Sequence, residues 1–303
     1  MYRKILVPLD GSAKAEQAVP VAIGLARRSN AEVHLMHCLD FVSLPPAETS
    51  TDWMHASACS DAELYLQSVA APIASTVRVS VHTCSEESDA ASAILNESNR
   101  VGYDLVIMTT HGRGVFDRAW LGSVADAVVR QSPIPVLLLR ANPHEALRGE
   151  EPFRHVLLPL DGSSLAERMF KPAVMLARAN SARLTLLQIV HPWVMAVRPM
   201  AHAPHAANLR EVAVEKRSAE AEEYVSGLAM SVDPQLKDVA SDVLVAELSD
   251  AAEILKYAAA HAVDVIALAS HGRSGLKRLV LGSVADKLIR GADIPVLVLR
   301  PTE

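Results

Sequence analysis

A loop-and-helix segment that occurs twice in the chain carries the residues best suited to bind a ligand. In its second occurrence it runs from Ala269 through Gly272 and Arg273 to Gly282 and Ser283. Glycine lets backbone N–H groups approach a ligand closely, and a helix start leaves N–H groups unpaired with partial positive charge. The amides of Gly272, Gly282 and Ser283 are therefore expected to be unpaired and to form an anion pocket, for which phosphate is the best fit.

The first occurrence has the same layout, with Thr109, Gly112, Arg113, Gly122 and Ser123 at the matching positions. Nine residues separate the loop glycine from the Gly-Ser pair in both copies. The loop arginines are expected to be phosphate partners, because guanidinium groups bind phosphate strongly.

The two loops differ in charge. Lys277 of the second loop is replaced by Asp117 in the first. This exchange makes the second copy the better anion site. Ser123 and Ser283 could also act as helix N-caps, which is compatible with phosphate binding.

A second repeated motif, Pro-Leu-Asp-Gly-Ser, ends the first apolar run of each half and contains Asp10 and Asp161. Asp-Gly-Ser is also common in turns and at helix N-caps, so the motif alone leaves a structural and a ligand-binding role open. Its recurrence opposite the glycine loop favours ligand binding, because in a doubly wound parallel sheet the first and fourth strands flank the point where strand order reverses.

Neither a catalytic residue nor a metal site is predicted. His111 and His271 lie beside the loop glycines, but no nucleophile or carboxylate is near them in sequence, which favours a structural role. His191, His202 and His205 lie in one loop, yet no cysteine or acidic residue has the spacing of a zinc ligand set.

Composition sets further limits. The chain has 303 residues, of which 50% are hydrophobic and 21% charged, with a net charge of −6. This favours two folded domains and argues against nucleic acid as a general partner. Three cysteines without a C-x-x-C pair fit a reducing cytoplasm. No signal-peptide pattern begins the chain and no apolar run reaches the ~20 residues that span a bilayer, so a cytoplasmic protein with no membrane partner is expected.

The chain also repeats as a whole. Lys4–Ser12 reappears as His155–Ser163, and Pro135–Arg140 reappears as Pro295–Arg300. Apolar runs alternate with helical patterns, which predicts an α/β fold of two tandem, doubly wound, five-stranded parallel-sheet domains. A first domain is expected at 1–142, a linker at 143–152 and a second domain at 153–303.

Short apolar runs rich in valine, isoleucine and leucine predict the strands Ile5–Leu9, Val33–Leu39, Val77–Thr83, Leu105–Thr109, Val136–Arg140, Val156–Leu160, Leu184–Val190, Val239–Val245, Val265–Ala269 and Val296–Arg300. Helical periodicity predicts helices over Ala13–Arg28, Ala56–Ala71, Asp89–Arg100, Val124–Gln131, Leu165–Ala179, Leu209–Ser231, Ala251–His261 and Val284–Arg290. A loop is expected over Phe41–His55.

Val-Pro-Leu-Asp-Gly-Ser after the first strand, together with His-Gly-Arg and the later Gly-Ser-Val-Ala-Asp, resembles the universal stress protein family in its tandem two-domain form. The resemblance covers nearly all of both halves and implies a Rossmann-like, adenine nucleotide alpha hydrolase-like fold with strand order 3-2-1-4-5. Nucleotide-binding members carry Gly-x-x-Gly, nine residues and then Gly-Ser or Gly-Thr. Here Thr109 and Ala269 replace the first glycine, and Thr109 is the bulkier of the two.

The resemblance implies an adenine nucleotide, ATP or AMP, with or without Mg²⁺, in each half. The aspartates would contact the ribose, the Pro-Leu pairs would flank the base, and Cys38 and Ile189 would contact adenine. The implied nucleotide-binding residues are Pro8, Leu9, Asp10, Cys38, Met108, Thr109, Gly112, Arg113, Gly122, Ser123, Val124 and Ala125 in the first half, and Pro159, Leu160, Asp161, Ile189, Leu268, Ala269, Gly272, Arg273, Gly282, Ser283, Val284 and Ala285 in the second.

Family members pair through the last strand, so the two halves are expected to pair with each other, with a homodimer as a further possibility. The expected function is nucleotide binding in stress response or signalling, best in the second half and with little or no turnover. A nucleotide-free interaction module is the alternative, favoured by the missing first glycine and the apolar loop Pro192–Val197. A weak ATPase ranks third. A P-loop ATPase and a hydride-transferring Rossmann enzyme are excluded, because their glycine motifs are absent.

Overall fold

The computed structural model describes residues 1–39, 51–84, 89–110, 121–140, 153–192, 206–236, 238–246, 249–270 and 281–300, with only the backbone described at 51–56 and 206–210. The chain forms two compact units, one comprising Met1–Pro152 and Leu297–Glu303 and the other Phe153–Val296.

The first unit contains a five-stranded sheet in the order β3-β2-β1-β4-β5. All four neighbouring pairs are parallel. Its elements are β1 Lys4–Leu9, α1 Ala13–Glu16, α2 Ala18–Ser29, β2 Glu32–Cys38, α3 Thr51–Ala70, β3 Arg78–Cys84, α4 Ala90–Val101, β4 Leu105–Thr109, α5 Ser123–Gln131 and β5 Val136–Leu139.

The second unit repeats the order of the first four strands with β8, β7, β6 and β9. The described pairs β6–β7, β6–β9 and β7–β8 are parallel. Its elements are β6 His155–Leu160, α6 Ser164–Glu167, α7 Phe170–Asn180, β7 Arg183–Val190, α8 Ala206–Met230, β8 Val239–Val245, α9 Asp250–Ala260, β9 Val265–Ala269 and α10 Ser283–Gly291. The last strand, β10 Val296–Leu299, begins at the final residue of this unit and otherwise belongs to the first. The α/β class and the strand order 3-2-1-4-5 are confirmed.

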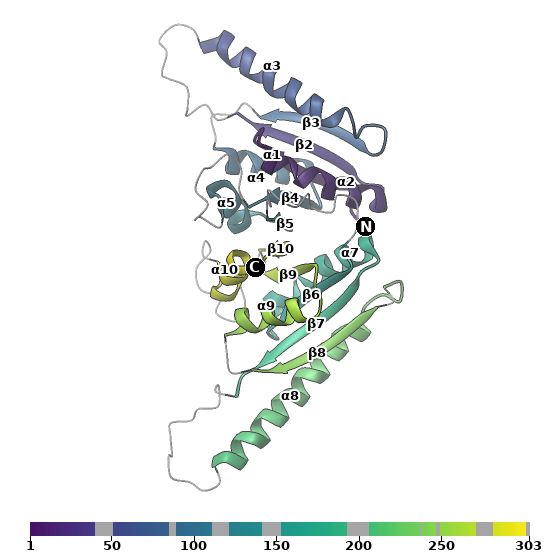
Figure 1. Cartoon of the computed structure of the whole chain (residues 1–303), viewed down its shortest axis with the longest axis vertical. Helices are drawn as coiled ribbons and strands as arrows, with labels where there is room; N and C mark the ends of the chain where they lie inside the picture. The colour runs from purple at the N-terminus through teal and green to yellow at the C-terminus, as the bar shows by residue number, and fades with distance from the viewer. Residues whose placement is uncertain are drawn as a thin grey trace. The chain divides into compact units, whose positions relative to one another are not determined.

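Helices cover both faces of each sheet, as Figure 1 shows for each unit. Right-handed crossovers place α2 and α3 on one face of the first sheet, since both of these connections move the chain in the same direction across it. The reversed crossover from β3 to β4 places α4 on the other face, where it packs against α5. Strands covered in this way read as continuous apolar runs, and every residue of β4 is buried.

Each predicted helix after the first strand of a half is in fact two helices. Ala13–Arg28 divides into α1 and α2, and Leu165–Ala179 divides into α6 and α7. Pro20 and Pro172 explain this, because each is the third residue of its second helix. Proline has no N–H to donate to the carbonyl four residues earlier, and its ring collides with that carbonyl. The earlier turn therefore cannot continue into the later helix.

Two other boundaries differ from the sequence prediction by more than one residue. α3 begins at Thr51, so the predicted loop over Phe41–His55 is wrong for its last five residues, and its first ten lie outside the described residues. α8 begins at Ala206, three residues before its predicted start at Leu209. Among the described residues, none of the helices has the length and apolar character that a membrane crossing requires.

A charged residue is buried in the first unit. Glu97 of α4 is 7% exposed, and its carboxylate accepts hydrogen bonds of 2.9 Å from both Nε and Nη2 of Arg100. The Tyr103 hydroxyl donates to the same carboxylate at 3.4 Å and lies 3.1 Å from Nδ1 of His34. Burial, followed by the charge of Glu97, raises the pKa of Tyr103, so its hydroxyl stays protonated. The buried carboxylate is thus hydrogen-bonded rather than isolated, as its burial requires.

A buried histidine occupies the start of β6 in the second unit. His155 is 8% exposed, its Nδ1 lies 3.1 Å from the carbonyl of His261, and its Nε2 lies 2.8 Å from the Thr185 hydroxyl. A carbonyl only accepts, so Nδ1 carries the proton and Nε2 accepts from Thr185 in the neutral ring. Burial is the main cause that lowers the pKa of His155 below its ordinary value. The neutral form is therefore the one that this environment stabilises.

Candidate functional site

The two repeated aspartates lie directly after β1 and β6 and form the same local structure. Oδ1 of Asp10 accepts hydrogen bonds from the amide of Ser12 at 2.9 Å and from its hydroxyl at 2.6 Å. Asp161 makes the same bonds, of the same lengths, with Ser163. Each serine side chain also caps the following helix by accepting from the amide three residues later. The structural role that the sequence left open for this motif is thus present, and it accounts for Oδ1 of each aspartate.

The glycine between each aspartate and serine is required by the backbone. Gly11 and Gly162 have φ angles of 79° and 77°. Residues with a Cβ rarely adopt this left-handed conformation. These turns hold both aspartates at the carboxyl ends of their strands, the end at which ligands bind in open parallel sheets.

The implied adenine contacts lie at the same end of the neighbouring strands. Leu9 pairs in register with His37, so Cys38 lies one residue beyond the end of β1. Leu160 pairs with Gln188 in the same way, which places Ile189 at the equivalent position. Both Cys38 and Ile189 are half-buried.

The remaining implied strand residues differ in exposure. Pro8, Pro159 and Ala269 are half-buried, whereas a second group is buried: Leu9, Met108, Thr109, Leu160 and Leu268. The buried side chains present little surface to a ligand, so contacts at these positions would come chiefly from the backbone.

Glycine is the N-cap of both helices that follow the loops. Gly122 has φ −65° and ψ 153°, and Gly282 has φ −60° and ψ 149°. Ser123 and Ser283 are the first residues inside α5 and α10, so the prediction that these serines are N-caps is wrong. Glycine has no side chain with which to cap, so neither N-cap residue makes a side-chain hydrogen bond to its helix.

The amides at these helix starts fall into two groups. The amide of Gly282 donates to the carbonyl of Ser270 at 2.8 Å, so the expectation that it is unpaired is wrong. Gly122 donates to Thr110 at 2.7 Å in the same way. These bonds fix each helix start against the end of the preceding strand. The next three amides form no hydrogen bond to any part of the chain that the structure describes, and they belong to Ser123, Val124 and Ala125 of α5 and to Ser283, Val284 and Ala285 of α10.

The loop residues predicted to complete the site lie outside the described residues. These are Gly112, Arg113, Gly272 and Arg273, together with the histidines and charged residues around them, His111, Asp117, His271 and Lys277. The part of the site that the structure places is therefore the aspartate turn, the strand ends and the helix start.

Both ring nitrogens of His191 have partners within the protein, which supports a structural role. Its Nδ1 lies 2.8 Å from the carbonyl of Ala246, and its Nε2 contacts the carboxylate of Asp250. His202 and His205 lie outside the described residues. Within the residues that are described, no group of three or more histidine, cysteine or acidic side chains could hold a metal ion.

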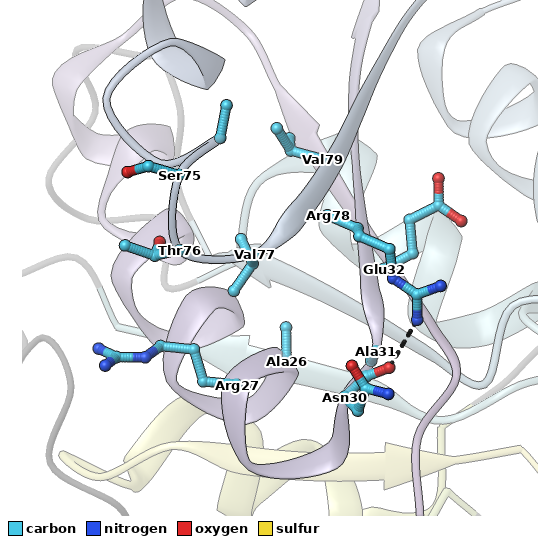
Figure 2. Close-up of a pocket in the computed structure, with 11 residues that line it drawn as sticks. Ala26, Arg27, Asn30, Ala31, Glu32, Ser75, Thr76, Val77, Arg78 and Val79 are labelled. Carbon is cyan, nitrogen blue, oxygen red and sulfur yellow. Dashed lines mark hydrogen bonds between the residues drawn. The ribbon is translucent and has the colours of Figure 1, made fainter.

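A pocket of about 750 Å³ lies at the other end of the first sheet, where β2 and β3 begin (Figure 2). At the rim of this pocket, Nη2 of Arg78 donates a hydrogen bond of 2.8 Å to the carbonyl of Asn30. Arg27 lies on the opposite side of the pocket from Arg78, beyond Ala26 and Val77. Ligands of parallel sheets bind at the carboxyl ends of the strands, so this pocket is not the predicted nucleotide site.

Comparison with known proteins supports the sequence resemblance. The Universal stress protein family matches residues 1–140 and 152–300. A universal stress protein of Mycolicibacterium smegmatis is 26% identical over 302 residues, which is 98% of this chain and 97% of that protein. One from Methanocaldococcus jannaschii is 32% identical over 143 residues, 46% of this chain and 83% of its own length.

A solved structure of a universal stress protein from Archaeoglobus fulgidus has a similar fold, with a TM-score of 0.69 at 20% identity, covering 98% of both chains. The match of two family domains, one in each half, covers nearly all of the sequence. The chain therefore belongs to the universal stress protein family and carries two of its domains in tandem.

Proposed function

We propose that this protein binds an adenine nucleotide, ATP or AMP, between the aspartate turn and the glycine-capped helix of each domain. The second domain, 153–303, binds more tightly than the first, 1–142. The protein acts by binding, as a stress-response or signalling protein, with little or no turnover. The observation that carries the proposal is the glycine at the N-cap of both α5 and α10.

Backbone conformation does not explain these two glycines. Their φ angles of −65° and −60° are open to any residue. Serine, aspartate and asparagine are better N-caps, because their side chains accept from the first helical amides. The same chain uses such residues elsewhere, with Ser12 capping α1 and Asp89 capping α4. Glycine at both positions supports a role in which a ligand, rather than a side chain, approaches the helix start.

The helix starts offer what a phosphate needs. Three amides at each start have no partner among the described residues, and the helix dipole adds partial positive charge there. Asp10 and Asp161 follow the strands that pair with β4 and β9, the strands that lead towards those helices. A carboxylate at one side and a positive helix start at the other suit a ribose hydroxyl and a phosphate group of one nucleotide.

Two differences favour the second domain. Ala269 is half-buried where the first domain has the larger, buried Thr109, which leaves more room beside the strand end. The second loop also carries Lys277 where the first carries Asp117. Each difference makes a phosphate easier to accommodate in the second domain.

The described contacts of Asp161 support binding without turnover. Its Oδ1 accepts two hydrogen bonds from Ser163, which gives this carboxylate oxygen a role in the turn rather than in proton transfer. Any Mg²⁺ would arrive with the nucleotide phosphates rather than through a protein ligand set. A weak ATPase is therefore the third candidate, tested by phosphate release over hours.

Two measurements test the proposal. Mass spectrometry of the small molecules released when the purified protein is denatured should detect an adenine nucleotide. Isothermal titration calorimetry of nucleotide-stripped protein with ATP and AMP should give saturable binding, weaker or absent when Gly282 is replaced by a bulky residue. Absence of both signals from a folded protein would refute nucleotide binding.

The second candidate is a nucleotide-free interaction module of the same family, which binds a partner protein or another small ligand. The hydrogen bonds from Gly122 and Gly282 to the preceding strand favour it, because they withdraw one amide from each pocket. Pairing of the two domains with each other, or of two chains in a homodimer, belongs to either candidate. Sedimentation velocity with and without ATP distinguishes pairing that depends on nucleotide from pairing that does not.

A further inference from the structure

Two of the three cysteines are neighbours in the first sheet. Cys38 ends β2 and Cys84 ends β3, and the two residues are direct partners in the parallel register. Neither of the two forms a disulfide bond in the structure. The pairing continues beyond them, because the amide of Leu39 donates to the carbonyl of Cys84 at 3.0 Å. The two residues are therefore held side by side.

Their geometry suits a covalent bond. Side chains at register partners of parallel strands point to the same face of the sheet. Neighbouring strands lie about 4.8 Å apart, and disulfides join residues with Cα atoms about 4.4–6.8 Å apart. The thiol of Cys38 lies 3.8 Å from the carbonyl of Ala90, at the start of α4, so both sulfur atoms face the α4 side of the sheet.

The pair belongs to the first domain alone. The register partners at the equivalent positions of the second sheet are Ile189 and Leu244. An aliphatic pair therefore satisfies the packing at this position, and packing does not require two cysteines. The third cysteine, Cys59, lies on α3 in a different part of the first unit.

We propose that Cys38 and Cys84 form a modification site that a peroxide converts to an intramolecular disulfide. Half-buried Cys38 reacts first, because Cys84 is only 9% exposed. Its sulfur displaces one oxygen of hydrogen peroxide, giving a sulfenic acid and water. The sulfur of Cys84 then attacks that sulfenic sulfur, forming the S–S bond and releasing a second water. Two thiols lose two electrons and two protons in total, and the peroxide is reduced to two waters.

The site lies beside the adenine contact implied for Cys38, so oxidation has a consequence that rests on the proposed function. A bond to Cys84 pulls the Cys38 side chain towards β3 and away from the space beyond β1. Oxidation should therefore weaken nucleotide binding in the first domain and leave the second domain, which has Ile189, unchanged.

The test treats the full-length protein with a small excess of hydrogen peroxide, blocks remaining thiols and maps peptides by mass spectrometry without reduction. The expected result is a linked peptide pair containing Cys38 and Cys84, lost on treatment with a reductant, with Cys59 blocked as a free thiol. Linkage through Cys59 instead, or irreversible oxidation of Cys38 with Cys84 still free, would overturn the proposal.

Matched variants separate the site from general damage. The double variant Cys38→Ile with Cys84→Leu installs the pair that the second domain already accommodates, so it should fold and form no intramolecular link. Cys59→Ser should keep the link. Calorimetry with ATP then separates the two proposals: equal binding in reduced and oxidised protein refutes the coupling, whereas no binding in either state refutes the nucleotide site and leaves the peptide map unaffected.

Discussion

Replacing Gly282 with aspartate should raise the stability of the second domain and weaken its nucleotide binding at the same time. The backbone of Gly282 already has the extended conformation of an N-cap, so the substitution needs no change in the chain. The new carboxylate can accept from the amides at the start of α10 that have no partner among the described residues. It would therefore occupy, from within the protein, the place that we assign to phosphate.

The expected magnitudes have opposite signs. An aspartate cap is better than glycine by a few tenths of a kcal/mol, and a charge at the helix start adds about 0.3–1 kcal/mol. A gain of about 1 kcal/mol raises the Tm of a domain of this size by roughly 2–4 °C. A carboxylate about 4 Å from a phosphate charge repels it by ~1 kcal/mol in water and by ~4 kcal/mol at a partly buried site. The affinity for ATP should fall by about 5-fold to 1000-fold.

Thermal unfolding and calorimetry with ATP measure the two effects on the same protein. Gly282→Ser is the neutral control, since it adds a cap without a charge and should reduce affinity less than aspartate. Gly122→Asp is the matched control in the first domain and should affect only the weaker site. A higher Tm with unchanged affinity would refute phosphate binding at α10, and a lower Tm would refute the argument from the glycine cap.

Three further predictions concern stability. Burial lowers the pKa of His155, so as the pH falls below about 6.5 the unfolded chain takes up a proton before the folded protein does. The free energy of unfolding should therefore decrease from that pH down to the lowered pKa. His155→Gln should reduce this pH dependence, measured by urea unfolding at pH 7.5 and pH 5. Ser12→Ala and Ser163→Ala should each lower the free energy of unfolding in denaturant by about 1 kcal/mol, because each removes a helix cap. An unchanged free energy would show that these hydroxyls do not stabilise the helices. Arg100→Ala should lower the free energy of unfolding by about 1–3 kcal/mol, because the buried carboxylate of Glu97 loses two hydrogen bonds. The loss should be smaller when Glu97 is replaced by glutamine, and an equal loss in both backgrounds would rule out this explanation.

The central strands could be predicted from the sequence because they are buried on both faces. Leu105–Thr109 and Val265–Ala269 were predicted with their observed bounds, since continuous apolar runs mark strands of this kind. Val239–Val245, at the edge of its sheet, was also predicted with its observed bounds, although none of its residues is buried. The helices were less predictable. Pro20 and Pro172 are visible in the sequence, but helical periodicity persists across the break that they cause, so periodicity alone predicts one continuous helix.

The hydrogen bonds at the candidate site were harder to predict than the positions of its residues. Asp10 and Asp161 lie at the strand ends as expected, but a carboxylate that holds its own turn and one that holds a ligand have the same sequence signature. The bond from Gly282 to Ser270 was missed, because it joins a helix start to a strand end across a loop of unknown path. Such bonds depend on where the loop returns, which local spacing does not specify.

Equivalent positions of the two domains can carry different residues where the position serves only packing or charge pairing. Glu32 and Arg78 are register partners in the first sheet, and the equivalent pair in the second is Arg183 and Asp238, with side chains 3.7 Å apart and their charges reversed. Charge pairing tolerates such a reversal, because either order places opposite charges side by side. The N-caps of α5 and α10 have not been exchanged in this way, although a side-chain cap would be more stable there. Helix stability alone does not account for glycine at both of these positions, whereas the proposed phosphate site, which needs open amides, would account for it.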